Sequence, residues 1–149
     1  MTDQLLVKDV MSTDLITLED EETLDLADQV MRLGRIRHLP VTDGQTLVGL
    51  VTHRDLLKAS ISAMADIGED ERQELMSRVK VREIMNRDIR TVPESLPLIR
   101  AARILLKNRF GCLPVVRDDA KLVGILTEAD FLRFSMTLIK RLEELESTR

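Results

Sequence analysis

Two segments of the chain share one order of apolar and polar positions. Leu47–Asp55 and Leu122–Asp130 both run from apolar residues through a glycine into Thr-x-x-Asp, and each is followed by apolar positions at helical spacing. An apolar strand that leads directly into a helix is the structure that this order predicts. Because the order occurs twice, 75 positions apart, the chain is predicted to contain an internal repeat.

The repeat extends over most of the chain. Val7–Met11 matches Val81–Met85 at an offset of 74 positions, and the same offset matches Leu39–Val41 with Leu113–Val115. One extra residue then enters a polar turn of the second copy, where repeats tolerate a change in length. We therefore predict two repeats, at residues 7–66 and 81–146, joined by a helical linker at residues 67–80.

Each repeat is predicted to have the order strand, helix, strand, strand, helix, which gives a mixed α+β fold. In repeat 1 the predicted elements are a strand at Leu15–Leu18, a helix from Glu19 to about Gly34, and a hairpin of Arg37–Thr42 and Thr46–Val51. In repeat 2 they are strands at Ile89–Val92, Cys112–Val116 and Lys121–Leu126, and a helix at Leu96–Asn108. The acidic run Glu19–Glu22 suits the positive end of a helix. Gly34 suits a helix C-cap and Asp43-Gly44 a tight turn.

Helical spacing also covers the linker and the end of the chain. Leu56–Lys80 is predicted to be helical with a break near Gly68, and a last helix runs from about Thr127 to Glu146. The last helix has apolar residues on one side: Phe131, Phe134, Leu138, Ile139, Leu142 and Leu145. It is longer than its own repeat can cover. We therefore expect it to pack on the other repeat or on a second copy of the chain.

Composition and charge narrow the classes of function. The 149 residues are 44% hydrophobic and 32% charged, which is typical of a globular protein, and the net charge of −4 argues against a nucleic-acid partner. No apolar run approaches the roughly 20 residues of a membrane helix, and Met1–Gln4 does not resemble a signal peptide. Cys112 is the only cysteine, so no intramolecular disulfide is expected and a reducing cytoplasm is the expected location.

The ordered set of motifs resembles a pair of CBS domains, which are cystathionine-β-synthase-type repeats that together form a Bateman module. The set is Val-x-x-Ile/Val-Met, a threonine in the first strand, Leu-Pro-Val, and Leu-Val-Gly followed by Thr-x-x-Asp, twice between Val7 and Leu132. The resemblance implies two β-α-β-β-α repeats packed as a pseudo-twofold disc. It also implies clefts between the repeats that bind AMP, ADP, ATP or S-adenosylmethionine, regulation of an attached or partner enzyme or transporter, and no catalysis.

The Thr-x-x-Asp motifs have two interpretations, and the residues alone leave both open. An aspartate one turn after a helix start can accept hydrogen bonds from the two hydroxyls of a ribose, and the helix end itself favours anions. A threonine at the N-cap with an acid three residues later also resembles a capping box, which stabilises a helix without any ligand.

The resemblance assigns ligand-binding roles in both repeats. In repeat 1 they fall on Ile16, Ile36, Arg37, Leu50, Thr52, Arg54 and Asp55. In repeat 2 they fall on Arg90, Phe110, Ile125, Thr127 and Asp130. The repeats differ in basic residues, because Gly111 and Ala129 of repeat 2 stand at the positions of Arg37 and Arg54. Arg90, at the position of Ile16, replaces their positive charge only in part. We therefore expect unequal clefts, with the cleft of Asp55 the better phosphate binder.

Other chemistry has little support in the sequence. His38 and His53 lack a cysteine or carboxylate at metal-ligand spacing, and Cys112 takes the position of His38 within a predicted strand, as an inert core thiol would. There is no glycine-rich phosphate loop and no nucleophile–base set, so we expect no catalytic residue, no metal and no required cofactor.

Two functions remain from the sequence. The first is a regulatory module that binds an adenosine-containing ligand and signals to a regulated enzyme or transporter. The second is a non-catalytic dimerisation or interaction module with empty clefts. A homodimer is expected in either case, with no nucleic acid and no membrane as partner.

Overall fold

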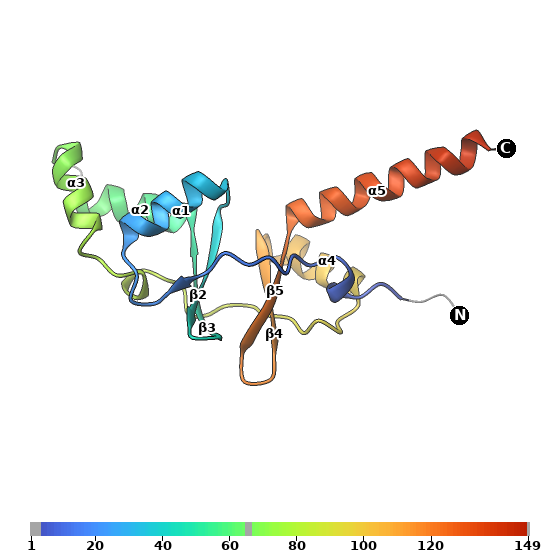
Figure 1. Cartoon of the computed structure of the whole chain (residues 1–149), viewed down its shortest axis with the longest axis horizontal. Helices are drawn as coiled ribbons and strands as arrows, with labels where there is room; N and C mark the ends of the chain where they lie inside the picture. Colours follow the sequence, from blue (N-terminus) through green and yellow to red (C-terminus); the bar gives the residue numbers. More distant parts are fainter. Residues whose placement is uncertain (1–3, 65–66, 149) are drawn as a thin grey trace. The chain divides into compact units, whose positions relative to one another are not determined.

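The computed structural model describes residues 4–64 and 67–148, and these divide into two units (Figure 1). The first, here called the Asp55 unit, consists of Ile16–Ile89 and Asp118–Leu122. The second, the Asp130 unit, consists of the residues up to Leu15, Arg90–Arg117 and the residues from Val123 onward. Each unit therefore contains the opening segment of the other repeat.

The sheet of the Asp55 unit takes its strands from repeat 1. β1 (Leu18–Glu19) pairs in parallel with β2 (His38–Asp43), and β2 pairs antiparallel with β3 (Thr46–Thr52). Gly44 in the turn between β2 and β3 has a φ of 63°, a conformation that favours glycine, so the predicted hairpin is confirmed. The helical elements are α1 (Leu24–Gly34), α2 (His53–Met64), α3 (Glu69–Met76) and the 3-10 turn η2 (Val81–Glu83).

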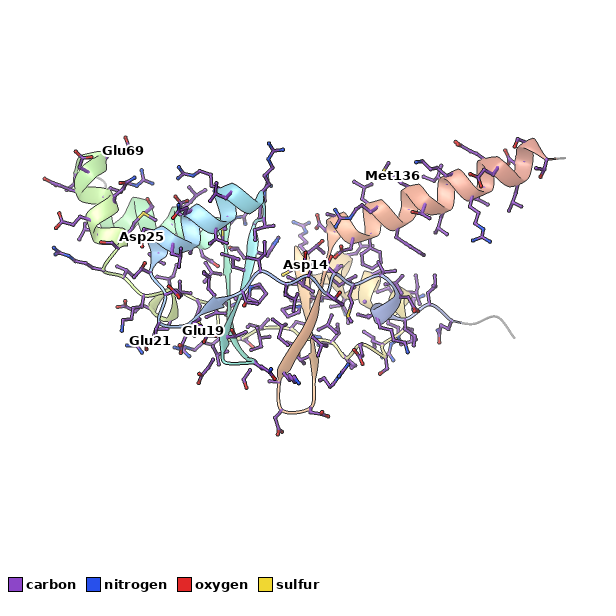
Figure 2. The ribbon with its side chains drawn as sticks, in the orientation of Figure 1. Asp14, Glu19, Glu21, Asp25, Glu69 and Met136 are labelled. Carbon is purple, nitrogen blue, oxygen red and sulfur yellow. The ribbon has the colours of Figure 1, made fainter. Side chains whose placement is uncertain are left out.

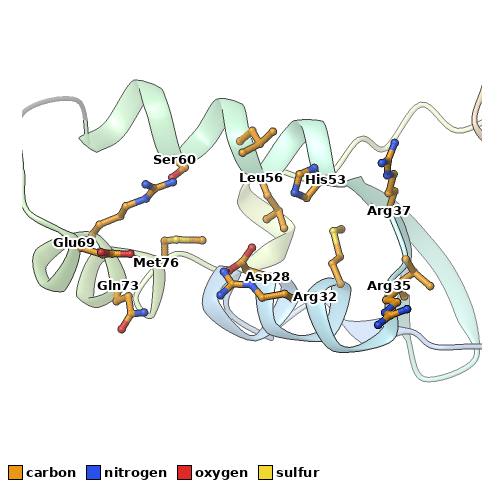
Figure 3. Close-up of a pocket in the computed structure, with 14 residues that line it drawn as sticks. Asp28, Arg32, Arg35, Arg37, His53, Leu56, Ser60, Glu69, Gln73 and Met76 are labelled. Carbon is orange, nitrogen blue, oxygen red and sulfur yellow. The ribbon is translucent and has the colours of Figure 1, made fainter.

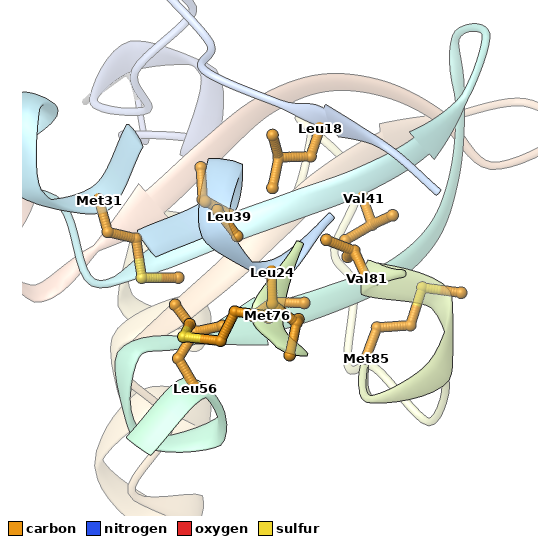
Figure 4. Packing of buried hydrophobic residues seen from close by; sticks show 11 residues of the cluster. Leu18, Leu24, Met31, Leu39, Val41, Leu56, Met76, Val81 and Met85 are labelled. Carbon is orange, nitrogen blue, oxygen red and sulfur yellow. The ribbon is translucent and has the colours of Figure 1, made fainter. Parts of the chain in front are cut away.

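The core of the Asp55 unit lies between this sheet and its helices (Figure 4). Apolar side chains from the strands, α1 and α2 form most of it: Leu18, Leu24, Ala27, Met31, Leu39, Val41, Val51 and Leu56. Met76 of α3 completes one side, and Val81 and Met85, which open repeat 2, complete another. The sheet of repeat 1 is thus covered in part by residues that belong to repeat 2 in the sequence.

The Asp130 unit is built in the same way from repeat 2. It contains β4 (Cys112–Arg117) and, from Val123 onward, the neighbouring strand β5 (Lys121–Thr127). Its helical elements are η1 (Val7–Asp9), α4 (Leu98–Asn108) and α5 (Glu128–Ser147). Its core contains Val7, Val92, Leu98, Ala101, Leu105, Leu113, Val115 and Leu126. Val7 opens repeat 1, so this core also includes the other repeat's first segment. The predicted mixed α+β fold is confirmed.

Only the first turns of α5 are covered by the core. Phe131 and Phe134 pack against it, whereas every described residue from Ser135 onward is exposed. Figure 1 shows the remainder of α5 extending away from the sheet of its unit. Within the described ranges, no helix is both long and apolar enough to cross a membrane.

Two glycines allow the opening segments to approach the sheets closely. A methyl group on Gly49 would lie 2.3 Å from the sulfur and 2.7 Å from Cγ of Met85. A methyl group on Gly124 would lie 2.5 Å from the sulfur of Met11. Each methionine therefore occupies the space that a side chain on the glycine would need, which explains why both repeats combine Ile/Val-Met with Leu-Val-Gly.

Backbone hydrogen bonds fix the same contacts. Leu50 N–H donates to the carbonyl of Asn86 at 3.0 Å, and Asn86 N–H donates to the carbonyl of Leu50 at 2.9 Å. Ser12 and Ile125 exchange the equivalent pair at 2.9 and 3.0 Å. Each opening segment is thus bonded to the strand that carries the glycine.

The predicted start of the first helix is wrong. α1 begins at Leu24, not at Glu19, because Asp20 and Glu22 use their carbonyls to accept hydrogen bonds from the backbone N–H groups of Arg82 and Val81. Glu21, labelled in Figure 2, pairs with Lys80 and Arg82 rather than with a helix end. Hydrogen bonding from Lys80, aided by the positive charge of Arg82, lowers the pKa of Glu21 below its ordinary value.

Two further predictions differ from the structure. Gly34 is the last helical residue of α1, and Arg35 is the left-handed C-cap, with a φ of 52°. Hydrogen bonds from the N–H groups of Arg35 and Ile36 to the carbonyl of Met31 stabilise this end, so no glycine is required. The strand predicted at Ile89–Val92 is reduced to one bridge, between Val92 and Val115.

The helical stretch between the repeats is interrupted, as predicted near Gly68. α2 ends at Met64, and α3 begins after Gly68, which is its N-cap. Residues 65–66, including the boundary predicted for repeat 1 at residue 66, lie outside the described residues.

The close approach at Gly49 gives a stability prediction. Gly49→Ala forces Met85 to move at Cγ as well as at its sulfur, so we expect the free energy of unfolding to fall by about 1–3 kcal/mol. Urea denaturation measures the change. Gly68→Ala is the control, because a methyl group there meets nothing within 4 Å and its φ is −70°, so only the loss of a glycine N-cap, below about 1 kcal/mol, is expected. Equal effects of both substitutions would contradict the packing argument.

Candidate functional site

The first candidate site is the corner where β3 leads into α2, here called the Asp55 corner. Thr52 N–H donates to Oδ2 of Asp55 at 2.9 Å, and Asp55 N–H donates to Oγ1 of Thr52 at 3.2 Å. The next N–H, that of His53, donates to the carbonyl of Arg37 at 2.9 Å. The motif is therefore a capping box that also fixes the end of β2 against the start of α2.

The equivalent corner in the other unit, the Asp130 corner, has more hydrogen bonds. Oδ2 of Asp130 accepts from Thr127 N–H at 2.8 Å and from Oγ1 of Thr127 at 3.1 Å. Oδ1 accepts from Oγ of Ser12 at 2.8 Å and from the guanidinium of Arg133 at 2.8 Å. Asp130 is only 5% exposed. Both of its carboxylate oxygens are thus bonded within the unit.

Asp55 differs from Asp130 in its exposure and in its hydrogen bonds. It is half-buried, and within the part of the chain that the structure describes its Oδ1 has no hydrogen-bond partner. The position of Ser12 in the repeat is Asn86, whose side-chain oxygen accepts instead from Asp88 N–H at 3.1 Å. The two corners therefore share a backbone design, but only Asp55 has a carboxylate oxygen available to another molecule.

The other residues predicted for repeat 1 all lie in the Asp55 unit. Ile16 and Ile36 flank Gly34, since a methyl group on that glycine would lie 3.5 Å from one and 3.6 Å from the other. Arg37 precedes His38, which pairs with Thr52 across the hairpin, so it lies at the same end of the sheet as Asp55.

Leu50 and Arg54 complete the set of repeat 1. Leu50 is half-buried in β3, where it is bonded to Asn86, and Arg54 is exposed in the first turn of α2. The structure thus places Arg54 beside the Asp55 corner and Leu50 two residues before it along β3.

The residues predicted for repeat 2 all lie in the Asp130 unit. Ile125 is bonded to Ser12 beside the Asp130 corner. Phe110 follows the left-handed Arg109 at the end of α4 and is exposed, and Arg90 is also exposed. Ser12 and Arg133 were not predicted. The offset of 74 that pairs Ser12 with Asn86 is the sequence signal that could have identified Ser12 as a difference between the corners.

Comparison with family models identifies both repeats. The model of the CBS domain matches residues 7–62 and 81–137. The chain belongs to the CBS domain family. The two corners described above are therefore the Thr-x-x-Asp corners of a CBS pair.

Relatives of this CBS pair include short proteins and parts of larger enzymes. A CBS domain-containing protein of Dictyostelium discoideum is 34% identical over 141 residues, which cover 94% of this chain and 95% of that protein. An inosine-5'-monophosphate dehydrogenase of Methanocaldococcus jannaschii is 32% identical over 132 residues. That match covers 88% of this chain but only 23% of the enzyme.

Solved structures of CBS pairs have the same fold. A Vibrio cholerae protein assigned to acetoin utilization (AcuB) is 34% identical, with a TM-score of 0.80 over 95% of this chain and 98% of that one. CBSX2 in complex with AMP is 33% identical, with a TM-score of 0.74 over 89% and 97%. The CBS domain pair of protein MJ0100, in complex with 5'-methylthioadenosine and S-adenosyl-L-methionine, is 29% identical, with a TM-score of 0.73 over 91% and 98%.

Cys112 and the potential metal ligands are the remaining candidates for chemistry. Burial raises the pKa of the Cys112 thiol to about 12, so at neutral pH it is protonated and is a poor nucleophile. Among the described residues, no group of three or more His, Cys, Asp and Glu side chains is placed to hold a metal ion.

The unequal corners give a second stability prediction. Asp55→Ala removes one capping interaction and should lower the free energy of unfolding by about 0.5–2 kcal/mol. Asp130→Ala also leaves Ser12 and Arg133 without their partner, so we expect a loss about 1–3 kcal/mol larger. Urea denaturation of both variants measures the difference. Equal losses would show that the extra hydrogen bonds of Asp130 contribute nothing to stability.

Proposed function

We propose that this CBS pair is a regulatory module that binds an adenosine-containing ligand at the Asp55 corner and passes the signal to a partner protein. The ligand is AMP, ADP, ATP or S-adenosylmethionine. The module itself catalyses no reaction. The protein that it regulates is an enzyme or a transporter.

The observation that carries the proposal is the available carboxylate oxygen of Asp55. A ribose offers two neighbouring hydroxyl donors, and a carboxylate beside a helix N-terminus can accept from them. Asp55 keeps its capping bond through Oδ2 while Oδ1 accepts from the ligand. Asp130 would first have to release Ser12 or Arg133.

The surroundings of Asp55 suit the rest of an adenine nucleotide. Arg37 and Arg54 lie at the same end of the sheet and supply positive charge for a phosphate. Ile16 and Ile36 flank Gly34 and offer apolar surface for a base. Relatives support the ligand class, because CBSX2 was crystallised with AMP and the MJ0100 pair with S-adenosyl-L-methionine.

A ligand at this corner regulates by shifting populations. It stabilises whichever arrangement of α2 and β3 presents Oδ1 of Asp55 and the arginines together, by its difference in affinity for the two arrangements. Because Asp55 also caps α2, the ligand acts directly on the start of that helix. The partner senses the new arrangement.

Nucleotide binding is tested by thermal unfolding of the chain with millimolar AMP, ATP or S-adenosylmethionine. A ligand present at 100 times its Kd stabilises the folded state by about 2.7 kcal/mol, which raises the Tm by several degrees. We expect this rise in the wild-type protein and in Asp130→Ala, and its loss in Asp55→Ala. Each variant is compared with its own Tm without ligand, because both substitutions also remove a cap.

Loss of the rise in Asp130→Ala alone would contradict the assignment to the Asp55 corner. No rise with any of the three ligands would favour the second function, an interaction module whose Thr-x-x-Asp motifs serve only as helix caps.

A specific observation also supports self-association through α5. Leu138, Leu142 and Leu145 continue the helix face that Phe131 and Phe134 begin, but no described part of the chain covers them. A second apolar face carries Leu132, Met136 and Ile139. Figure 2 shows Met136 on this uncovered part of the helix.

The apolar face of α5 fits a second copy of the chain as its cover. In an antiparallel pair of α5 helices, the face of each copy that carries Leu138, Leu142 and Leu145 covers the same face of the other. This is the self-complementary surface that a twofold dimer needs. We include a homodimer through α5 in the proposal.

The dimer is tested by the molar mass in solution, measured by light scattering after gel filtration. We expect twice the chain mass of 17.0 kDa for the wild-type protein and a single chain for Leu142→Glu. The matched control is Leu106→Glu on α4, because Leu106 is more exposed (81%) than Leu142 (61%) but lies off α5. A wild-type monomer, or loss of the dimer in the control as well, would exclude α5 as the interface.

A further inference from the structure

A cavity of about 540 Å³ lies within the Asp55 unit, between α1, α2 and α3 (Figure 3). Neither Thr52 nor Asp55 lines it, although both stand at the start of α2. Its lining from α2 comes from His53, Leu56, Leu57 and Ser60, which recur at the spacing of one helix face. The cavity therefore lies beside the Asp55 corner, with which it shares α2 and also Ile36 and Arg37, but its buried floor is formed by residues that do not belong to that corner.

The buried side chains that line the cavity are apolar except for one hydroxyl. Met31, Leu56 and Met76 are buried and belong to three different helices. Ser60 is only 4% exposed, and its Oγ has no hydrogen-bond partner among the described residues. A buried hydroxyl without a partner is costly, and native structures rarely leave one without a reason. In Figure 3, Ser60 and Leu56 lie on α2, across the cavity from Arg32 on α1 and Met76 on α3.

The rim of the cavity is positively charged. Four arginines line it, at positions 32, 35, 37 and 72, against two carboxylates, Asp28 and Glu69. Arg32 is paired with Asp28, but Arg35, Arg37 and Arg72 form no ion pair with any described residue. A chain with a net charge of −4 thus gathers three arginines without a described ion-pair partner around one cavity.

We propose that this cavity binds a small organic anion, with its apolar body against Met31, Leu56 and Met76 and its charged group at Arg72. The charged group is a carboxylate or a phosphate, both of which match the donors of a guanidinium. The hydroxyl of Ser60 donates to an oxygen of the ligand and so gains the partner that it lacks. The inference does not depend on nucleotide binding at the Asp55 corner.

The test uses methyl NMR of the full chain labelled at its methionine methyl groups. Pentanoate and pentyl phosphate are the anionic probes, and pentylamine is the cationic control of the same length. We expect at least one of the two anions, at millimolar concentration, to shift the methyl signals of Met31 and Met76, and the shift to saturate as more anion is added. Pentylamine should shift neither, and Met136 on α5 should not respond to any probe.

Two substitutions identify the binding groups. Arg72→Gln should weaken binding of the anion about tenfold or more, because it removes the charged donor. Ser60→Ala should weaken it several-fold without lowering the Tm, because no described residue is a hydrogen-bond partner that the hydroxyl would lose. Arg78→Gln is the matched control on α3: Arg78 pairs with Glu74 and does not line the cavity.

Preference for pentanoate or pentyl phosphate distinguishes the two kinds of anion. Equal binding of pentylamine, or unchanged affinity in both Arg72→Gln and Ser60→Ala, would overturn the proposal. The proposal would also be overturned if the Met31 and Met76 signals changed with protein concentration but not with the probes. A second copy of the chain, rather than a small anion, would then cover the cavity. The rise in Tm with AMP, measured on the same samples, shows separately whether the proposal of nucleotide binding holds.

Discussion

The close approach of two methionine segments to two strand glycines is the constraint on which the rest of the structure depends. Met85 lies where a side chain on Gly49 would be, and Met11 lies where a side chain on Gly124 would be. Because each methionine comes from the opposite repeat, neither repeat contains all the residues of its own core. The chain passes between the two units four times. A single copy of the repeat would therefore lack part of the core that covers its sheet.

The same exchange creates the difference between the two Thr-x-x-Asp corners. The opening segment of repeat 1 delivers Ser12 to Asp130, whereas the opening segment of repeat 2 delivers Asn86 to the strand beside Asp55. A hydroxyl can donate to the nearby carboxylate, but the Asn86 side chain is held by Asp88. The exchange of Ser12 for Asn86 thus helps to separate a carboxylate that is bonded through both oxygens from one whose Oδ1 has no hydrogen-bond partner among the described residues.

Much of the fold could be predicted from the sequence, because its signals are local. The Gly44 turn, the capping motif at Thr52 and the apolar face of α1 depend on neighbouring residues. The early helix start at Glu19 failed because backbone groups of residues 20–22 bond to a segment some 60 positions away. For the candidate site, the sequence predicted which residues stand at the two corners but not which carboxylate oxygens are already hydrogen-bonded. No local pattern shows that Ser12 reaches Asp130, 118 positions further along the chain.

α2 connects the two proposed binding sites. Asp55 caps its first turn, and Ser60, five positions later, faces the cavity between the helices. A ligand that binds at the first turn and an anion that fills the cavity would therefore act on the same helix, α2. Linkage requires that any effect of one on the affinity for the other be reciprocal. The capping box is then more than a stabilising contact, because it makes the position of α2 depend on the state of the carboxylate that a nucleotide would bind.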